Sequence, residues 1–147
     1  DYPDGYIPML IAGIEKYGRK VICGYHGSLV LKPNNRRLFS YQRPLDVDVP
    51  CHILGTGCMG YHSSSFLVGL RDLLPGKIDD QVAMRAQYDQ VPMTILAHPG
   101  NWIKDRADYS RSPKALCRNQ QVKKEAWDRV SNFTWQLYGT EEMEEEM

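Results

Sequence analysis

The chain has no apolar run long enough to cross a membrane: the longest, residues 7–14, is broken by Pro8 and Gly13. Its opening residues, DYPDGY, do not have the pattern of a signal peptide. P-loop, G-x-G-x-x-G, G-x-S-x-G and H-E-x-x-H motifs are also missing from the sequence. We therefore expect no transmembrane segment, and these four enzyme classes receive no support.

The four cysteines, Cys23, Cys51, Cys58 and Cys117, form no C-x-x-C pair. None stands near a helical histidine pair either, so we do not expect a structural zinc site. Cys23 and Cys51 lie in apolar, strand-like runs, where a free thiol behaves as a small hydrophobic side chain. Reduced, buried cysteines suit a reducing compartment, so we expect a cytoplasmic protein, with peripheral association with a membrane as the alternative.

The charge pattern argues against nucleic-acid binding. The 18 basic and 18 acidic residues cancel, and five of the acids fall in the last seven residues, a tail that we expect to be disordered. Basic residues concentrate between Lys104 and Arg129, but their helical spacing and the interleaved acids favour a solvated helix face. The modest basic bias ahead of the tail is compatible with a ligand that carries phosphates.

Alternating helix and strand patterns over 147 residues predict one α/β domain with a mixed sheet. We expect helices at residues 4–17, 66–74, 79–88 and 114–137, and strands at 21–25, 28–31, 51–54, 58–61 and 92–97. Residues 36–43 are expected to form a strand or an irregular lid. Asp4 is the predicted cap of the first helix and Gly18 its terminator. The strands within residues 21–31 are predicted to form a small antiparallel element at the sheet edge.

Gly55-Thr56-Gly57 separates two short apolar runs inside residues 49–66. Two glycines around one hydroxyl residue permit positive φ angles and close approach of the backbone to another group. The pattern predicts a strand that breaks at a hinge and resumes, which is one way to build a binding loop. A plain turn or bulge is the alternative interpretation.

The order of several short motifs resembles the C-terminal half of a GT-A fold glycosyltransferase, closest to the family 2 kind and similar in layout to polysaccharide polymerases. The motifs are YPDGY at residues 2–6, GYHG at 24–27, LGTG at 54–57, DD at 79–80, and Pro92 followed by AHP at 97–99 and Trp102. The resemblance covers residues 1–103. It leaves residues 104–140 as a C-terminal helical extension and 141–147 as the acidic tail.

The resemblance implies a glycosyltransferase that moves a sugar from a nucleotide-sugar donor to a carbohydrate or other hydroxyl acceptor. Transfer is expected to be inverting and to depend on Mn²⁺ or Mg²⁺. The family's D-x-D cluster, which binds metal and nucleotide, is expected just upstream, where only Asp1 stands. We therefore expect a processed chain or one piece of a longer protein, with the N-terminal half of the domain as a partner.

The resemblance also assigns residue roles. Asp80 is the expected catalytic base, and Asp79 positions the acceptor or caps the helix. His98 is the expected metal ligand, and imidazole suits manganese better than magnesium. Residues 55–57 would line the acceptor pocket, and Trp102 would stack on a sugar ring.

Each assignment has a structural alternative. Both acids at 79–80 would only cap their helix, His98 would be satisfied by backbone groups, and Trp102 would be a core residue. For Arg36, Arg37 and Arg43 we favour a solvated loop over contact with a diphosphate, and for His26 a structural role. Ser63-Ser64-Ser65 is expected to cap the helix at 66–74. The competing functional class is a non-catalytic carbohydrate-binding or scaffold module with a decayed transferase layout.

Overall fold

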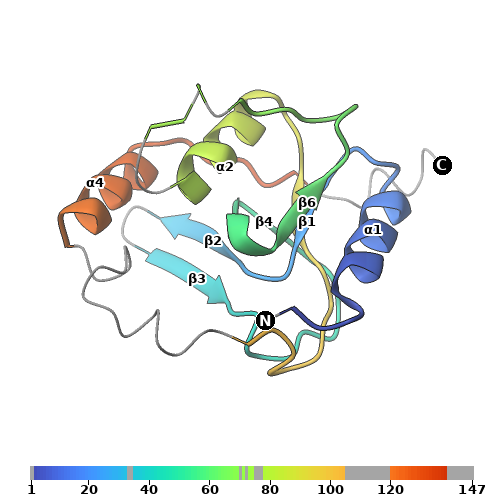
Figure 1. The fold of residues 1–147 in the computed structure, drawn as a ribbon. Coiled ribbons are helices and arrows are strands. Elements are labelled where there is room, and N and C mark those ends of the chain that lie inside the picture. The colour runs from blue at the N-terminus through green and yellow to red at the C-terminus, as the bar shows by residue number, and fades with distance from the viewer. Residues whose placement is uncertain are drawn as a thin grey trace.

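The computed structural model describes residues 2–32, 35–69, 71, 73–74, 78–104 and 120–138. Within them the elements follow the order α1 (Tyr6–Lys16), β1 (Ile22–Gly24), β2 (Gly27–Lys32), β3 (Asn35–Phe39), β4 (Val49–Cys51), β5 (Ile53–Leu54), the 3₁₀ turn η1 (Thr56–Cys58), β6 (Met59–Tyr61), α2 (Ile78–Tyr88), β7 (Met93–Ile95) and α4 (Gln120–Ser131). Figure 1 shows this arrangement.

Two sheets organise the fold. The larger has the strand order β4-β7-β1-β6 and the smaller β3-β2-β5. The central pair of the larger sheet, β1 and β7, is parallel, with Ile22 opposite Met93 and Gly24 opposite Ile95. The other pairings are antiparallel. The chain is thus mixed α/β with a mixed parallel and antiparallel sheet, as the sequence predicts.

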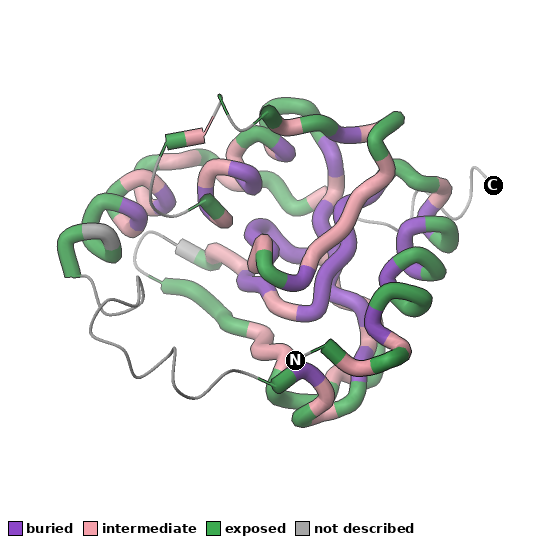
Figure 2. Tube along the Cα trace, in the orientation of Figure 1, coloured by how far each residue is buried: buried purple, intermediate pink, exposed green. Residues whose placement is uncertain are grey.

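The larger sheet separates two apolar cores, because neighbouring residues of a strand point to opposite faces. Ile22 belongs to one core, with residues of α2 and Val130 of α4, whereas Cys23 belongs to the other, with residues of α1. Both side chains are completely buried. Figure 2 shows the buried residues running through the central strands and the inner sides of the helices.

Helix α1 lies against β1 and β6 through a stripe that includes Leu10 and Ile14. Gly13 keeps this contact close, since a Cβ placed on it would lie 2.5 Å from a methyl carbon of Leu96. Gly18 follows the helix with a φ of 67°, which confirms its predicted role as terminator. The predicted cap by Asp4 is wrong: Gly5 precedes the helix, and no side chain caps it.

Three further predictions about secondary-structure elements are wrong. β1 and β2 belong to different sheets, and β1 is central rather than part of an edge hairpin. Residues 66–69 form no helix, because Phe66 turns into the core, and the serines before it therefore cap nothing there. Helix α4 ends at Ser131 rather than at 137, since Asn132, Phe133 and Thr134 are poor helix formers.

The start of the predicted last helix, Cys117 and the acidic tail lie outside the described residues. Among the described residues, the cysteines at 23, 51 and 58 are free and buried, as predicted. None of the helices in the described part of the chain has the length and apolar character needed to span a membrane.

Candidate functional site

Four strand ends meet at one edge of the larger sheet. β1 and β7 are parallel and both run toward this edge. β6 and β4 pair with them in the opposite direction, with Met59 opposite Gly24 and Val49 opposite Ile95, so both begin there. In open α/β sheets, ligands bind outside the carboxyl ends of parallel strands. This edge is therefore the place where a site is expected.

The structure brings three predicted segments to this edge. His26 follows β1, His98 follows β7, and residues 55–57 directly precede β6. Gly55 lies against His26: its backbone N–H donates to the His26 carbonyl at 2.8 Å, and a Cβ on Gly55 would lie 3.1 Å from the imidazole. The hinge glycines do not use positive φ angles, and Gly55 has a φ of −71°. Closeness to His26, rather than backbone freedom, is what Gly55 provides.

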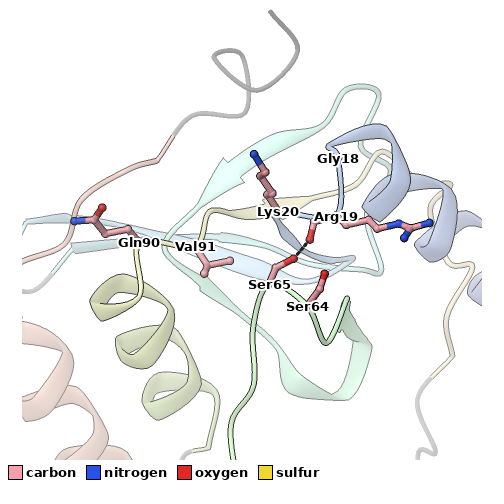
Figure 3. Close-up of a pocket in the computed structure, with 7 residues that line it drawn as sticks. All are labelled: Gly18, Arg19, Lys20, Ser64, Ser65, Gln90 and Val91. Carbon is pink, nitrogen blue, oxygen red and sulfur yellow. Dashed lines mark hydrogen bonds between the residues drawn. The ribbon is translucent and has the colours of Figure 1, made fainter. Parts of the chain in front are cut away.

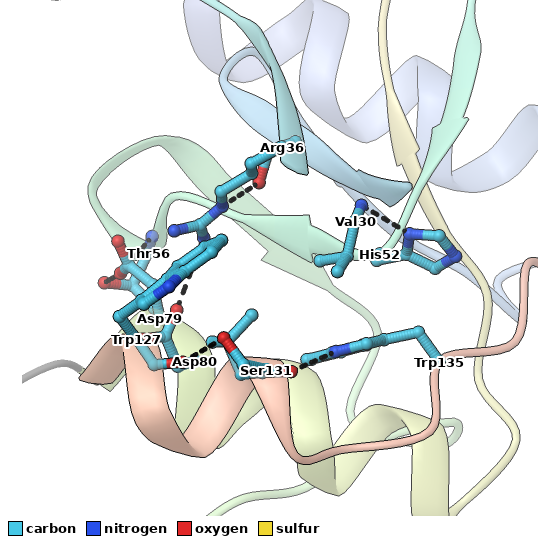
Figure 4. A network of polar contacts seen from close by, with 11 residues as sticks. Val30, Arg36, His52, Thr56, Asp79, Asp80, Trp127, Ser131 and Trp135 are labelled. Atoms are coloured by element: carbon cyan, nitrogen blue, oxygen red, sulfur yellow. Dashed lines mark hydrogen bonds and ion pairs between the residues drawn. The ribbon is translucent and has the colours of Figure 1, made fainter. Parts of the chain in front are cut away.

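Asp79 attaches the hinge to helix α2. Its Oδ1 accepts hydrogen bonds from the Thr56 backbone N–H at 2.9 Å and from the Thr56 hydroxyl at 2.5 Å. The carboxylate is half-buried and stands in the first turn of α2, where the helix dipole favours negative charge. The predicted acidic pair and the predicted hinge are thus in direct contact (Figure 4).

Asp80 points to a different partner. Its side chain is 4% exposed, and its Oδ1 lies 3.4 Å from Nη2 of Arg36. Arg36 comes from β3, and its Nε donates to the Ser28 hydroxyl at 2.9 Å. A buried carboxylate needs such a countercharge, because an unpaired charge in the interior is costly. Arg36, for which the sequence favoured a solvated loop, lies instead on β3, where its partly exposed side chain pairs with the buried Asp80.

His98 has one nitrogen bound and the other unpaired. Nδ1 lies 2.8 Å from the Leu96 carbonyl, and because a carbonyl only accepts, Nδ1 carries the proton. Nε2 is buried and has no hydrogen-bond partner among the described residues. A metal-binding histidine typically donates its other N–H to a backbone carbonyl in this way. The lone pair of Nε2 therefore fits the metal-ligand role that the sequence predicts.

The rest of a metal site is not assembled by this part of the chain. Within residues 2–104 and 120–138, as far as the structure describes them, no group of three His, Cys, Asp or Glu side chains is close enough to hold an ion. These described residues therefore provide no partner ligands for the predicted metal role of His98.

An aromatic cluster connects the hinge with His98. The Tyr2 hydroxyl donates to the Gly57 carbonyl at 2.8 Å, and the rings of Tyr2 and Tyr6 are 4.6 Å apart. Tyr25 then lies 5.2 Å from Tyr6 and meets the His98 ring edge-on at 5.7 Å. Burial raises the pKa of Tyr6 to about 12 and also raises that of Tyr25, so these phenols are neutral at physiological pH.

Trp102 belongs to the same cluster. Its ring meets Tyr25 edge-on at 5.2 Å and lies 6.4 Å from Tyr6. It also packs on Gly5, where a Cβ would lie 3.5 Å from the indole. The side chain is half-buried, so core contacts occupy much of its surface.

Asp48 fixes the segment that carries His98. Its Oδ1 accepts from the Ala97 backbone N–H at 2.8 Å, and its Oδ2 accepts from the Tyr17 hydroxyl at 2.5 Å and from Lys16 at 3.3 Å. Burial alone would raise the pKa of Asp48, but these hydrogen bonds outweigh it and lower the pKa below its usual value. The backbone next to the imidazole is therefore anchored to α1.

A cavity of about 320 Å³ opens beside His98, between β3 and the turn that follows it. Arg37 and Arg43 contribute cations to its lining, and Ser40 a hydroxyl. Leu45 pairs with His98 through backbone hydrogen bonds and forms one wall. No hydrogen bond or ring contact between described residues joins His98 directly to Thr56. The hinge and the histidine therefore share an edge and an aromatic cluster rather than a single contact.

A second cavity, of about 380 Å³, lies at the opposite edge of the sheet, where Lys20 precedes β1 and Val91 precedes β7. Figure 3 shows that the side chains of Arg19, Lys20 and Gln90 project away from one another. The Ser65 hydroxyl is already bound to the Arg19 carbonyl. The polar groups do not converge here, so this cavity is not the candidate site.

Sequence reasoning missed two contributors to the site. Arg36 was considered only for a diphosphate or a solvated loop, and its pairing with Asp80 was not predicted because the contact spans 44 positions of the chain. The residues around it were expected to form a strand or an irregular lid, and Asn35–Phe39 is a strand, which was the available signal. Tyr2 was part of a recognised motif, but its bond to Gly57 spans 55 positions. Comparison with protein-family models and with curated proteins finds no match for this chain.

Proposed function

We propose that the chain forms the acceptor side of a GT-A-like glycosyltransferase. Such an enzyme transfers a sugar from a nucleotide donor to a carbohydrate or other hydroxyl acceptor, with inversion and with Mn²⁺ or Mg²⁺. The observation that carries the proposal is the gathering of the hinge, the acidic pair and His98 at the carboxyl edge of β1 and β7. The unpaired Nε2 of His98 supports it further.

In this proposal the acidic pair removes the acceptor's proton. As the acceptor oxygen forms its bond to the anomeric carbon, its proton passes to a carboxylate, and the bond from that carbon to the phosphate oxygen breaks. The nucleoside diphosphate leaves with the electron pair of that bond. A divalent metal, when bound, supplies charge neutralisation for the diphosphate. The sequence predicts Asp80 as the base and His98 as the protein's contribution to metal binding.

The remaining predicted residues hold the acceptor. Thr56 and the backbone of Gly55 and Gly57 would recognise sugar hydroxyls, and the contact of Thr56 with Asp79 supports this assignment. Trp102 offers its half-exposed ring for stacking on a pyranose, whose apolar face suits an aromatic plane. The cavity beside His98, with Arg37 and Arg43, is wide enough to hold phosphate groups near the imidazole.

The test is release of nucleoside diphosphate from a panel of uridine and guanosine diphosphate sugars with Mn²⁺, by the full natural protein that contains this chain. We expect turnover that a chelator abolishes and that falls in His98→Ala. Asp89→Asn is a matched control, because Asp89 is exposed, directly follows α2 and, among the described residues, forms its ion pair with Arg85. Turnover that is insensitive to the chelator and unchanged in His98→Ala would contradict the metal role.

A simpler observation bears on the same proposal. The codons that precede Asp1 in the gene can be read directly. A strand pattern ending in D-x-D there would supply the missing metal and nucleotide ligands. Any other sequence counts against catalysis by this arrangement.

The second candidate is a carbohydrate-binding module without catalysis. The burial of Asp80 against Arg36 favours it, because this carboxylate has a structural partner. A glycan array separates the two functions. Retention of a glycan, with no nucleoside diphosphate released from any donor, would identify the binding module.

A further inference from the structure

The two acids at the start of α2 lead away from each other. Consecutive residues of a helix are separated by about 100° around its axis. Asp79 therefore reaches η1 and its Thr56, whereas Asp80 reaches Arg36 on β3. Figure 4 shows both contacts at the end of the helix. Although they are neighbours in sequence, the two carboxylates have different surroundings.

We propose that Asp79 is the proton-accepting carboxylate of the transferase and that Asp80, bound to Arg36, is a positioning residue. This inference rests on the proposed function and reverses the roles that the sequence suggests. In this arrangement the ion pair between Asp80 of α2 and Arg36 of β3 holds the neighbouring carboxylate of Asp79 in position.

Access separates the two residues. The Asp80 side chain is 4% exposed, and the guanidinium next to it is itself held by Ser28. A sugar hydroxyl cannot approach a carboxylate that is closed off in this way. Asp79 is half-buried and stands beside the hinge at the sheet edge. It is the acid of the pair that a bound acceptor can reach.

The contacts of Asp79 leave one oxygen for chemistry. Both Thr56 donors bind Oδ1, and Oδ2 has no hydrogen bond to any residue in the described segments. Two donors on one oxygen fix the plane of the carboxylate, so the direction of Oδ2 is fixed too. In the transfer step the acceptor's proton goes to Oδ2 while the new carbon–oxygen bond forms and the nucleoside diphosphate departs.

Arg36 completes the arrangement. Two adjacent carboxylates repel each other, and one of them is buried, so a fixed cation beside Asp80 reduces the cost of both charges. Because Arg36 also bonds to Ser28, it ties the start of α2 to the smaller sheet. Loss of Arg36 is expected to displace the first turn of α2 and with it the carboxylate of Asp79.

The experiment compares Asp79→Asn with Asp80→Asn. Asparagine at 79 keeps the Oδ1 acceptor for Thr56 and replaces Oδ2 by an amide NH₂, so the hinge contact survives. We expect Asp79→Asn to lower kcat by ~10²–10⁴-fold with an unchanged melting temperature. Asp80→Asn is expected to lower the melting temperature and to keep measurable turnover.

The pH profile provides the readout that a structural role would not move. The acidic limb of kcat/KM reports titration of the base. We expect this limb to persist in Asp80→Asn and to disappear from the residual activity of Asp79→Asn. In a double-mutant cycle, Arg36→Met and Asp80→Asn should be strongly non-additive in melting temperature, and Arg36→Lys should restore part of the loss.

The two proposals fail in different ways. If the full natural protein that contains this chain releases no nucleoside diphosphate from any donor, the proposed function falls and this inference with it. If the wild type is active and Asp79→Asn keeps its kcat, only the division of roles is overturned. A folded Asp80→Asn variant that loses all turnover and its acidic limb would return the base to Asp80.

Discussion

The backbone N–H of Val30 donates to Nδ1 of His52 at 2.9 Å, and this bond joins the smaller sheet to the strand segment before the hinge. The acceptor nitrogen must be unprotonated for the bond to exist. The imidazole is buried and lies 5.9 Å from the Trp135 ring. Burial lowers the pKa of His52 below its usual 6.5, so the folded chain holds it neutral.

We expect the folded chain to lose stability as the pH falls below about 6.5, the pKa of an unperturbed histidine. The unfolded chain binds a proton at His52 that the folded chain rejects, so the free energy of unfolding decreases until the lower folded pKa is reached. Each unit of pKa lowering corresponds to about 1.4 kcal/mol. Urea unfolding between pH 7.5 and about 5 measures the effect.

His52→Asn is the control, because the asparagine Oδ1 sits where Nδ1 was and still accepts from Val30 without titrating. The loss of stability below about pH 6.5 should be smaller in this variant than in the wild type. An equal loss in both would show that another group is responsible.

Gly27 and Gly57 form a matched pair for a packing test. A Cβ on Gly27 would lie 2.6 Å from the Ile53 carbonyl oxygen, which is backbone of the paired strand and cannot move aside. A Cβ on Gly57 would have no atom within 4 Å. We expect Gly27→Ala to lower the free energy of unfolding by about 1–3 kcal/mol, and Gly57→Ala to change it by less than about 0.5. Equal effects would contradict the register between β2 and β5.

The buried thiols should resist alkylation in the folded chain. Burial raises the pKa of Cys23 to about 12 and of Cys58 to about 11, and it also raises that of Cys51. The reactive thiolate is therefore scarce at pH 8. Cys117→Ser removes the thiol that lies outside the described residues. In that variant we expect mass spectrometry to find rapid labelling by iodoacetamide only after denaturant is added; rapid labelling of Cys58 without it would contradict the burial.

Asp48→Asn tests the anchor of the His98 segment. The substitution removes the negative charge that the Tyr17 hydroxyl and Lys16 contact, and we expect a loss of about 1–3 kcal/mol in unfolding free energy. Since the folded pKa of Asp48 is lowered, its contribution is present above about pH 3.8 and is lost as the pH falls through the folded pKa. The wild type should therefore lose this part of its unfolding free energy between about pH 3.8 and the lower folded pKa of Asp48. The variant has no carboxylate at this position and should lack this loss. An unchanged acid transition would contradict the role.

Local sequence patterns predicted the helices and strands better than they predicted which strands pair with one another. The helix at 79–88 and the buried strands around Cys23 and Ile95 follow from apolar spacing and are present at nearly the expected residues. Sheet membership depends on contacts far apart in the chain, so the assignment of β1 to an edge was wrong. Residues 66–69, the start of the helix expected at 66–74, are not helical because tertiary burial of Phe66 outweighed a local helical pattern.

The candidate site was predictable in its components but not in its connections. Motif order identified the hinge, the acidic pair and His98, and the strand ends do place the hinge and His98 at one edge. No short-range signal separates Asp79 from Asp80. Their difference arises from Thr56 and Arg36, which lie 23 and 44 positions away. The roles of these residues in catalysis stay predictions.

The parallel pairing of β1 with β7 affects folding of the chain during its synthesis. β1 is synthesised before its parallel neighbour, which is complete only once Ile95 has been made. Until then one side of β1 has no strand to hydrogen-bond with, and an unpaired strand edge favours aggregation. Nascent chains cut short before β7 should therefore depend on chaperones, while chains that include it should be released folded.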